Sequence, residues 1–239
     1  RAVSLNANYG VGRYSGWADW PFFNLNTGTR MIRPPSDWWE LYRIEFEVGD
    51  RDEDGIPDGY DLCPDDAVEE LHDSNQNGVG DRCDPCPTCG NIARSKQTTA
   101  STNLGGDYHQ RKAVDGKTSE ERGAPYTYWL SRSGSQWLEV NLQRSHEVCV
   151  IRWINTLHMG HQNYSTRDWR ISIMTAEGEV FVGEGTEGAI PFREWRTIVL
   201  ADAGADVCPV ANRIKFYVDS TNESGGGMTE IEAYGRGVE

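Results

Sequence analysis

The most constraining feature of this chain is a pair of acidic loops that repeat with an offset of 23 residues. The same positions (1, 3, 5, 6, 9 and 12) carry oxygen-bearing side chains and a glycine in both: Asp50, Asp52, Asp54, Gly55, Asp58 and Asp61 in the first loop, and Asp73, Asn75, Asn77, Gly78, Asp81 and Asp84 in the second. Carboxylates at this spacing repel one another and resist burial. The loops therefore need a local counterion.

Most of the net charge of the chain lies in this one segment. Residues 50–84 contain thirteen Asp and Glu against two Arg, which accounts for −11 of the formal net charge of −14. The rest of the chain is nearly neutral, so a basic footprint for nucleic acid is absent. No apolar run approaches the roughly 20 residues that a bilayer span requires. We expect neither a nucleic-acid partner nor a transmembrane segment.

The repeated pattern matches the needs of a hard cation with six to eight oxygen ligands. Oxygen ligands stand at positions 1, 3 and 5, a glycine allows a sharp turn at position 6, and the backbone carbonyl at position 7 belongs to Ile56 or Val79. Calcium suits such a crowded cage better than magnesium. The alternative is an acidic disordered linker, which does not explain two complete registers. Without metal we expect the segment to be disordered, because metal binding would supply the folding energy.

The segment "DRDEDGIPDGYDLCP" and the segment "DSNQNGVGDRCD" closely resemble thrombospondin type 3 repeats, in which calcium ions are wrapped by loops with little regular secondary structure. The resemblance covers residues 50–84 and implies a disulfide between Cys63 and Cys83. It also implies the following metal ligands: Asp50, Asp52, Asp54, Ile56, Asp58, Asp61, Asp73, Asn75, Asn77, Val79, Asp81 and Asp84.

The six cysteines, an even number, favour disulfides and an oxidising compartment, so we expect a protein that is secreted, extracellular or on the cell surface. The spacing of Cys83, Cys86 and Cys89 could also begin a zinc or iron–sulfur site. We favour a Cys86–Cys89 bridge at the domain junction and a Cys149–Cys208 bridge between two strands. Because the chain begins at Arg1, we expect a processed secreted protein or an excised fragment.

Three segments of different composition follow one another. Residues 1–49 form an aromatic-rich segment with a strand-like alternation near its end, and we expect it to pack either on its own later domain or on a neighbouring subunit. Residues 50–89 are the calcium-binding segment. Residues 90–239 contain at least seven short alternating runs separated by Gly, Asn, Asp and Ser, among them "QWLEVNL", "VCVIRW" and "RIKFYV". Such runs predict an all-β, antiparallel sandwich.

The stretches "NIARSKQTTAST", "KAVDGKTS", "STRDWRISI" and "MTEIEAYG" resemble the signatures of the discoidin family, also called coagulation-factor C-type or galactose-binding-like domains. The resemblance covers residues 91–237 and implies an eight-stranded jelly-roll β-sandwich. Many members of this family bind carbohydrate through loops at one end of the sandwich. The resemblance also implies a structural calcium site at Asp115 and Glu230, although Asp115-Gly116 could equally be only a turn.

Two loops offer the planar polar groups and aromatic rings that sugar sites combine. The candidate ligand-binding residues are Tyr108, His109, Arg111, His158, His161 and Asn163. Sequons make Asn163 and Asn222 possible glycosylation sites.

We find no sequence motif for catalysis and expect a protein that is not an enzyme. The expected function is calcium-stabilised adhesion through a glycan or a cell-surface or matrix component. The alternative is a structural subunit that assembles through residues 1–49 into a homo-oligomer or filament.

Overall fold

The computed structural model describes residues 49–56, 58, 60–67, 72–118, 126–156, 164–187, 194–201, 207–222 and 224–238. The chain divides into two compact units, Arg1–Glu70 and Leu71–Glu239, and each is treated by itself. The second acidic loop therefore belongs to the same unit as the β-sandwich. The expectations for residues 1–48, including the strand near their end and assembly through this segment, lie outside the described residues.

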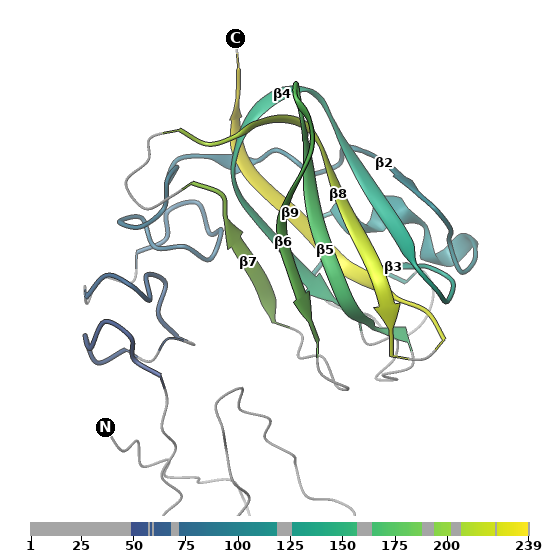
Figure 1. Cartoon of the computed structure of the whole chain (residues 1–239), viewed down its shortest axis with the longest axis horizontal. Helices are drawn as coiled ribbons and strands as arrows, with labels where there is room; N and C mark the ends of the chain where they lie inside the picture. The colour runs from purple at the N-terminus through teal and green to yellow at the C-terminus, as the bar shows by residue number, and fades with distance from the viewer. Residues whose placement is uncertain are drawn as a thin grey trace, which may run out of the picture. The chain divides into compact units, whose positions relative to one another are not determined.

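The second unit is an antiparallel β-sandwich, as the alternating runs predict (Figure 1). Its elements in chain order are β1 (Gly90–Asn91), β2 (Gln97–Ala100), the 3-10 helices η1 (Gly106–Tyr108) and η2 (Gln110–Val114), β3 (Trp129–Leu130), β4 (Gln136–Asn155), β5 (Thr166–Thr175), β6 (Gly178–Thr186), β7 (Trp195–Val199), β8 (Val210–Thr221) and β9 (Gly227–Gly237). No helix in the parts of the chain described above is long and apolar enough to cross a membrane.

Strand β4 links the two layers of the sandwich. Its first half pairs with β2 and β8, whereas its second half pairs with β7 and β9. The sequence suggests two separate runs here, but the structure joins them into a single strand. A register shift between Asn141 and His146 and a positive φ of 72° at Gln143 bend the strand without ending it.

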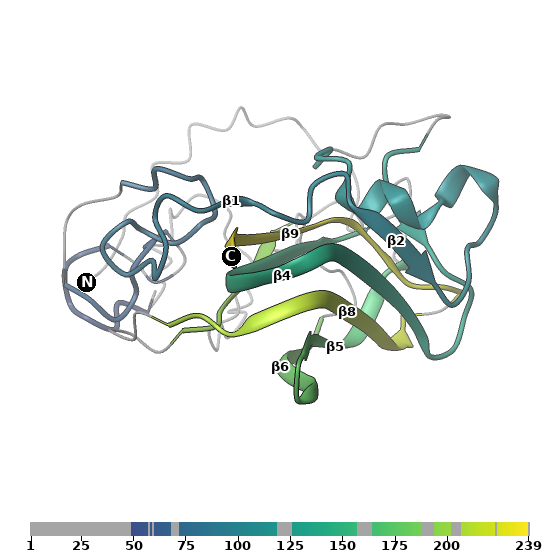
Figure 2. The ribbon, with the colours of Figure 1, turned by 90° about the horizontal axis from the view of Figure 1, so that it is seen from above.

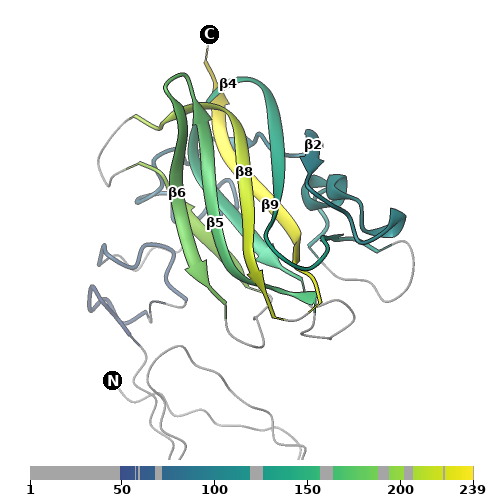
Figure 3. The same ribbon diagram turned by 45° about the vertical axis from the view of Figure 1, so that its right-hand side comes forward.

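The hydrogen-bonded order of the main path is β1-β9-β4-β8-β5-β6 (Figures 2 and 3). Strands β2 and β7 pair with β4, and β3 pairs with β9. Alternate residues of each strand face the core, so Leu138, Val140 and Leu142 of β4 are completely buried. The rings of Trp153 and Phe216 meet edge to face with centroids 4.6 Å apart inside this core.

The described part of the first unit, between residues 49 and 67, contains turns and bends and neither helix nor strand. This matches a segment with few apolar residues to bury. A backbone hydrogen bond of 2.7 Å from the Asp58 N–H to the Gly49 carbonyl closes its loop. Side-chain oxygens satisfy several of the remaining backbone N–H groups.

Candidate calcium loops and ligand-binding cluster

In the first loop, four carboxylates each use one oxygen to hold the backbone. Asp50 Oδ2 accepts from the Gly55 N–H at 3.1 Å, and Asp52 Oδ1 accepts from the Asp54 N–H at 3.2 Å. Asp54 Oδ1 accepts from the Ile56 N–H at 2.7 Å, and Asp61 Oδ1 accepts from the Cys63 N–H at 2.7 Å. Gly55 has φ 98°, a left-handed conformation that glycine adopts without strain. The sequence thus folds this loop around its own acids.

The second oxygen of each of these carboxylates is buried and has no hydrogen-bond partner among the residues that the structure describes. These atoms are Asp50 Oδ1, Asp52 Oδ2, Asp54 Oδ2 and Asp61 Oδ2. Carboxylate oxygens of the first three residues lie within 4.8 Å of one another. Partial desolvation and the neighbouring carboxylates raise the pKa of Asp52. The donor set, made only of hard oxygens, fits a calcium ion.

The second loop repeats this backbone pattern 23 residues later. The Gly78 N–H donates to Asp73 Oδ2 at 2.8 Å, the Asn77 N–H to Asn75 Oδ1 at 3.0 Å, and the Val79 N–H to Asn77 Oδ1 at 2.8 Å. Position 9 is also equivalent, because the Ser74 N–H donates to Asp81 Oδ1 as the Arg51 N–H does to Asp58 Oδ1. Position 4 has a positive φ in both loops, 61° at Glu53 and 59° at Gln76.

The expected site near Asp115 brings a buried carboxylate to a glycine turn. Glu230 is completely buried, its Oε1 accepts from the Gly116 N–H at 2.9 Å, and its Oε2 has no hydrogen-bond partner within the described part of the chain. Burial is the main cause that raises the pKa of Glu230 to about 9; the nearby Asp115 also acts to raise it, whereas the hydrogen bond from the Gly116 N–H and the charge of Arg94 act to lower it. A cation bound at Glu230 and Asp115 would relieve this desolvated charge, so these residues fit a calcium site.

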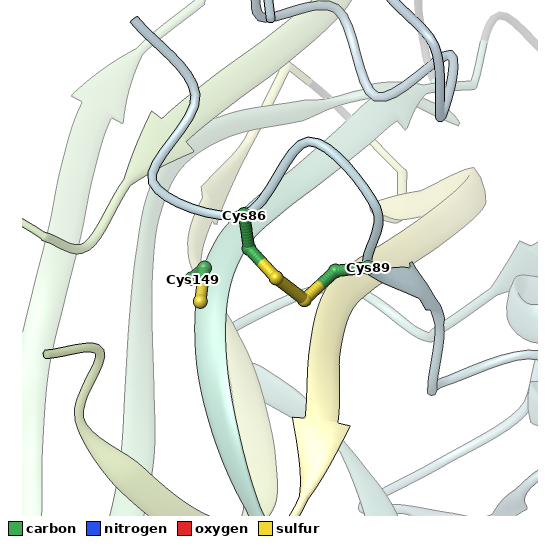
Figure 4. A group of neighbouring side chains, drawn as sticks. All are labelled: Cys86, Cys89 and Cys149. Carbon is green, nitrogen blue, oxygen red and sulfur yellow. A yellow bond between two sulfur atoms is a disulfide. The ribbon is translucent and has the colours of Figure 1, made fainter. Parts of the chain in front are cut away.

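In the second unit, the Cys86–Cys89 disulfide lies beside the side chain of Cys149 (Figure 4). Cys86 is bonded to Cys89 and Cys149 to Cys208, and the sulfurs of Cys86, Cys89 and Cys149 lie within 4.8 Å of one another. These are the two pairs that the sequence favours. Thiolates rather than disulfide sulfurs bind zinc, so the zinc and iron–sulfur alternatives do not fit this arrangement. None of the cysteines that the structure describes is a free thiol.

Tyr108, the aromatic residue proposed from the first ligand loop, packs with two further tyrosines. Tyr108 stacks on Tyr126 with ring centroids 4.8 Å apart, and Tyr128 lies 5.8 Å from Tyr108. Burial raises the pKa of Tyr108 to about 12. The ammonium of Lys112 donates to the backbone carbonyls of Asp107 and Tyr126, which ties the two segments together. The alternating aromatics of "YTYW" are the signal in the sequence that could have indicated Tyr126 and Tyr128.

The other proposed ligand residues have different surroundings. His109 caps η2, because its Nδ1 accepts from the Arg111 N–H at 3.3 Å, and the Arg111 side chain is exposed. His158, His161 and Asn163, the residues proposed from the second ligand loop, lie outside the described residues. The Asn222 side-chain nitrogen donates to Ser165 Oγ at 2.6 Å, which engages the atom that a glycan would modify.

Neither a protein-family model nor a curated protein sequence matches this chain. Solved structures with a similar fold include the chitosan-binding module 1 of a chitosanase/glucanase from Paenibacillus sp. IK-5, with 22% identity, 61% of this chain and 98% of that chain covered, and a TM-score of 0.47. Another is the family 32 CBM of C. perfringens NanJ in complex with galactose, with 19% identity, coverage of 59% and 93%, and a TM-score of 0.47. A fucose-binding module of Streptococcus pneumoniae has 18% identity, coverage of 61% and 95%, and a TM-score of 0.48.

Proposed function

We propose that this chain is a non-catalytic, calcium-stabilised extracellular protein that binds carbohydrate and serves in adhesion. The observation that carries the calcium part is the set of four buried carboxylate oxygens without hydrogen-bond partners in the described first loop. Such oxygens repel one another at these distances unless a cation lies among them. The disulfides support an extracellular location, because they persist in oxidising compartments.

In the first loop, calcium would be held by Asp50, Asp52, Asp54, Asp58, Asp61 and the carbonyl of Ile56. In the second, the corresponding donors are Asp73, Asn75, Asn77, Asp81, Asp84 and the carbonyl of Val79. The side chains also fix the backbone of each loop, so ligand placement and loop conformation depend on the same residues. Asp115 and Glu230 are proposed to hold a further ion in the sandwich.

We propose the Tyr108–Tyr126 stack as the sugar-binding platform. Aromatic rings pack against the C–H face of a sugar, and nearby polar side chains orient its hydroxyl groups. Both rings are half-buried, which leaves part of their surface open to solvent, and the exposed Arg111 supplies hydrogen-bond donors close along the chain. The stack and the Lys112 contacts hold the platform rigid before a ligand arrives.

Isothermal titration calorimetry with calcium tests the metal proposal. We expect heat of binding for the wild-type chain and loss of one class of site in Asp50→Ala/Asp54→Ala. Glu177→Ala removes an exposed acid outside every proposed site and is the control for a change in net charge. Absence of calcium binding by the wild-type chain would refute the metal proposal.

A glycan array followed by affinity measurement tests the carbohydrate proposal. We expect Tyr108→Ala to weaken binding on the order of tenfold, since one aromatic contact is removed from the ligand. Phe181→Ala is the matched control, because Phe181 is a 52% exposed aromatic residue on the edge strand β6. The carbohydrate proposal fails if no glycan binds, or if the two variants weaken binding equally.

A further inference from the structure

We propose that the two acidic loops differ in their dependence on calcium. The second loop keeps its fold without calcium, because its own amides and its packing on the sandwich hold it, whereas the first loop requires the ion. The inference rests on the calcium binding proposed above. It assigns different roles to two loops that look equivalent in sequence.

Amide groups in the second loop satisfy the carboxylate that closes it. Asp84 Oδ2 accepts hydrogen bonds from Asn75 Nδ2 at 3.0 Å and from Asn77 Nδ2 at 2.9 Å. Asn75 Nδ2 also donates to the Cys86 carbonyl at 3.0 Å, and Asp84 Oδ1 accepts from the Cys86 N–H. The partial positive charge of the amides thus meets the position-12 carboxylate, which calcium would otherwise neutralise.

The first loop has no such donors at the equivalent positions. Asp52 and Asp54 replace the two asparagines, and a carboxylate cannot donate to the position-12 residue Asp61. The result is the set of buried, unpartnered oxygens described above. Within the described part of the second loop, no buried side-chain oxygen is left without a partner in this way. One loop therefore needs an external cation, and the other has an internal substitute.

Packing is a second difference between the two loops. Val79 of the second loop is only 5% exposed and joins a cluster with Cys86, Cys89, Cys149, Cys208, Val150 and Tyr234. The Tyr234 hydroxyl lies 3.4 Å from the Gln76 carbonyl oxygen. The equivalent residue of the first loop, Ile56, is only half-buried. Burial of apolar surface in the second loop offsets part of the ordering entropy that metal binding must offset in the first.

Functionally, calcium would then control the folding of only one of the two acidic loops, the first. The sandwich and the second loop would stay folded at any calcium concentration, whereas residues 49–61 would become ordered only when calcium is present. Such a protein keeps its binding domain competent while calcium sets the stiffness of the preceding segment.

Hydrogen–deuterium exchange of the full chain, with calcium and with the chelator EGTA, tests this. We expect chelation to accelerate exchange by at least about tenfold in peptides from residues 49–61 and by less than about threefold in peptides from residues 72–84. Similar acceleration in both loops would overturn the inference while leaving calcium binding intact. Calorimetry on the same sample distinguishes the two failures, because a chain that binds no calcium overturns the metal proposal and the inference together.

Reciprocal variants exchange the chemistry of the two loops. Asn75→Asp/Asn77→Asp removes the amide donors, so we expect the second loop to lose protection in EGTA and to regain it in calcium. Asp52→Asn/Asp54→Asn adds donors to the first loop, so we expect a smaller effect of EGTA there. Near-UV circular dichroism of the sandwich tryptophans confirms that each variant is folded. The inference is wrong if the first variant stays protected in EGTA.

Discussion

Replacing Glu232 by Gln should show how strongly the surface beneath the second loop depends on one buried ion pair. The Arg152 Nε lies 2.6 Å from Glu232 Oε2, and the exposed fractions of the two side chains are 12% and 9%. The Tyr234 hydroxyl accepts from Arg152 Nη2 at 3.0 Å and donates to Glu232 Oε2 at 2.8 Å. The three side chains form one network, so the loss of the carboxylate affects all of them.

Removing one partner from a buried pair typically costs about 3–5 kcal/mol, because the other charge is left without compensation. Arg152 keeps its contact with the ring of Trp195, 4.2 Å from the ring centroid, which favours the lower end of this range. We therefore expect Glu232→Gln to lower the free energy of unfolding by about 3 kcal/mol. For a unit of this size, the corresponding fall in Tm is roughly 6–12 °C.

Urea unfolding followed by tryptophan fluorescence measures this change. The matched control is Glu147→Gln, which removes the partner of Arg236 in a pair whose Arg side chain is 60% exposed, and which should cost less than about 1 kcal/mol. A further variant, Arg152→Met/Glu232→Leu, should recover most of the loss because it removes both charges. Equal small effects of Glu232→Gln and Glu147→Gln would refute the reasoning.

Three further predictions follow from the sandwich. Cys149→Ala/Cys208→Ala should destabilise it by roughly 4 kcal/mol, because the bridge closes a loop of about 60 residues in the unfolded chain; a change below about 1 kcal/mol in urea unfolding would contradict this. In EGTA, the free energy of unfolding should fall by up to about 1.4 kcal/mol per pH unit as pH rises from about 4.5 towards 9, because the folded state favours protonated Glu230. Calcium or Glu230→Gln should reduce this dependence on pH. If Glu230→Gln leaves the dependence unchanged, Glu230 is not its source. Gly116→Ala should cost about 1–2 kcal/mol in thermal unfolding, since φ is 81° and the added Cβ would lie 2.5 Å from the Arg94 guanidinium; an unchanged Tm would show that the turn relaxes.

The strands could be predicted from the sequence because each buries one face. Runs such as residues 213–218 alternate apolar and polar residues at the period of a strand, and the structure places strand β8 over them. The continuity of β4 could not be predicted in the same way. Its two halves are separated by the polar residues 143–145, which look like a turn, but β8 pairs with β4 on both sides of them.

The tyrosine cluster that we propose as a sugar-binding platform was predicted only in part. Tyr108, His109 and Arg111 stand out because they are close together in the sequence, whereas Tyr126 packs on Tyr108 from a later segment. His109 shows that a residue type can also mislead. A histidine in this loop suggests a ligand contact, but its ring nitrogen accepts a hydrogen bond that caps a short helix. Residue type marks candidates, and the partners of each side chain depend on tertiary packing.

The two acidic loops show most clearly where sequence pattern stops determining chemistry. Their shared register predicts the shared backbone, because the side-chain oxygens at positions 1, 3 and 5 accept from the same N–H groups in both. Asparagine and aspartate are equivalent in that task, since each offers an oxygen acceptor. They differ in the other terminal atom of the side chain, which is the donor nitrogen Nδ2 in Asn77 and the acceptor oxygen Oδ2 in Asp54. The difference matters only in the closed loop, where Asn77 Nδ2 donates a hydrogen bond to the position-12 carboxylate of Asp84. In the first loop, Asp54 Oδ2 stays without a hydrogen-bond partner among the described residues, and its charge has still to be neutralised.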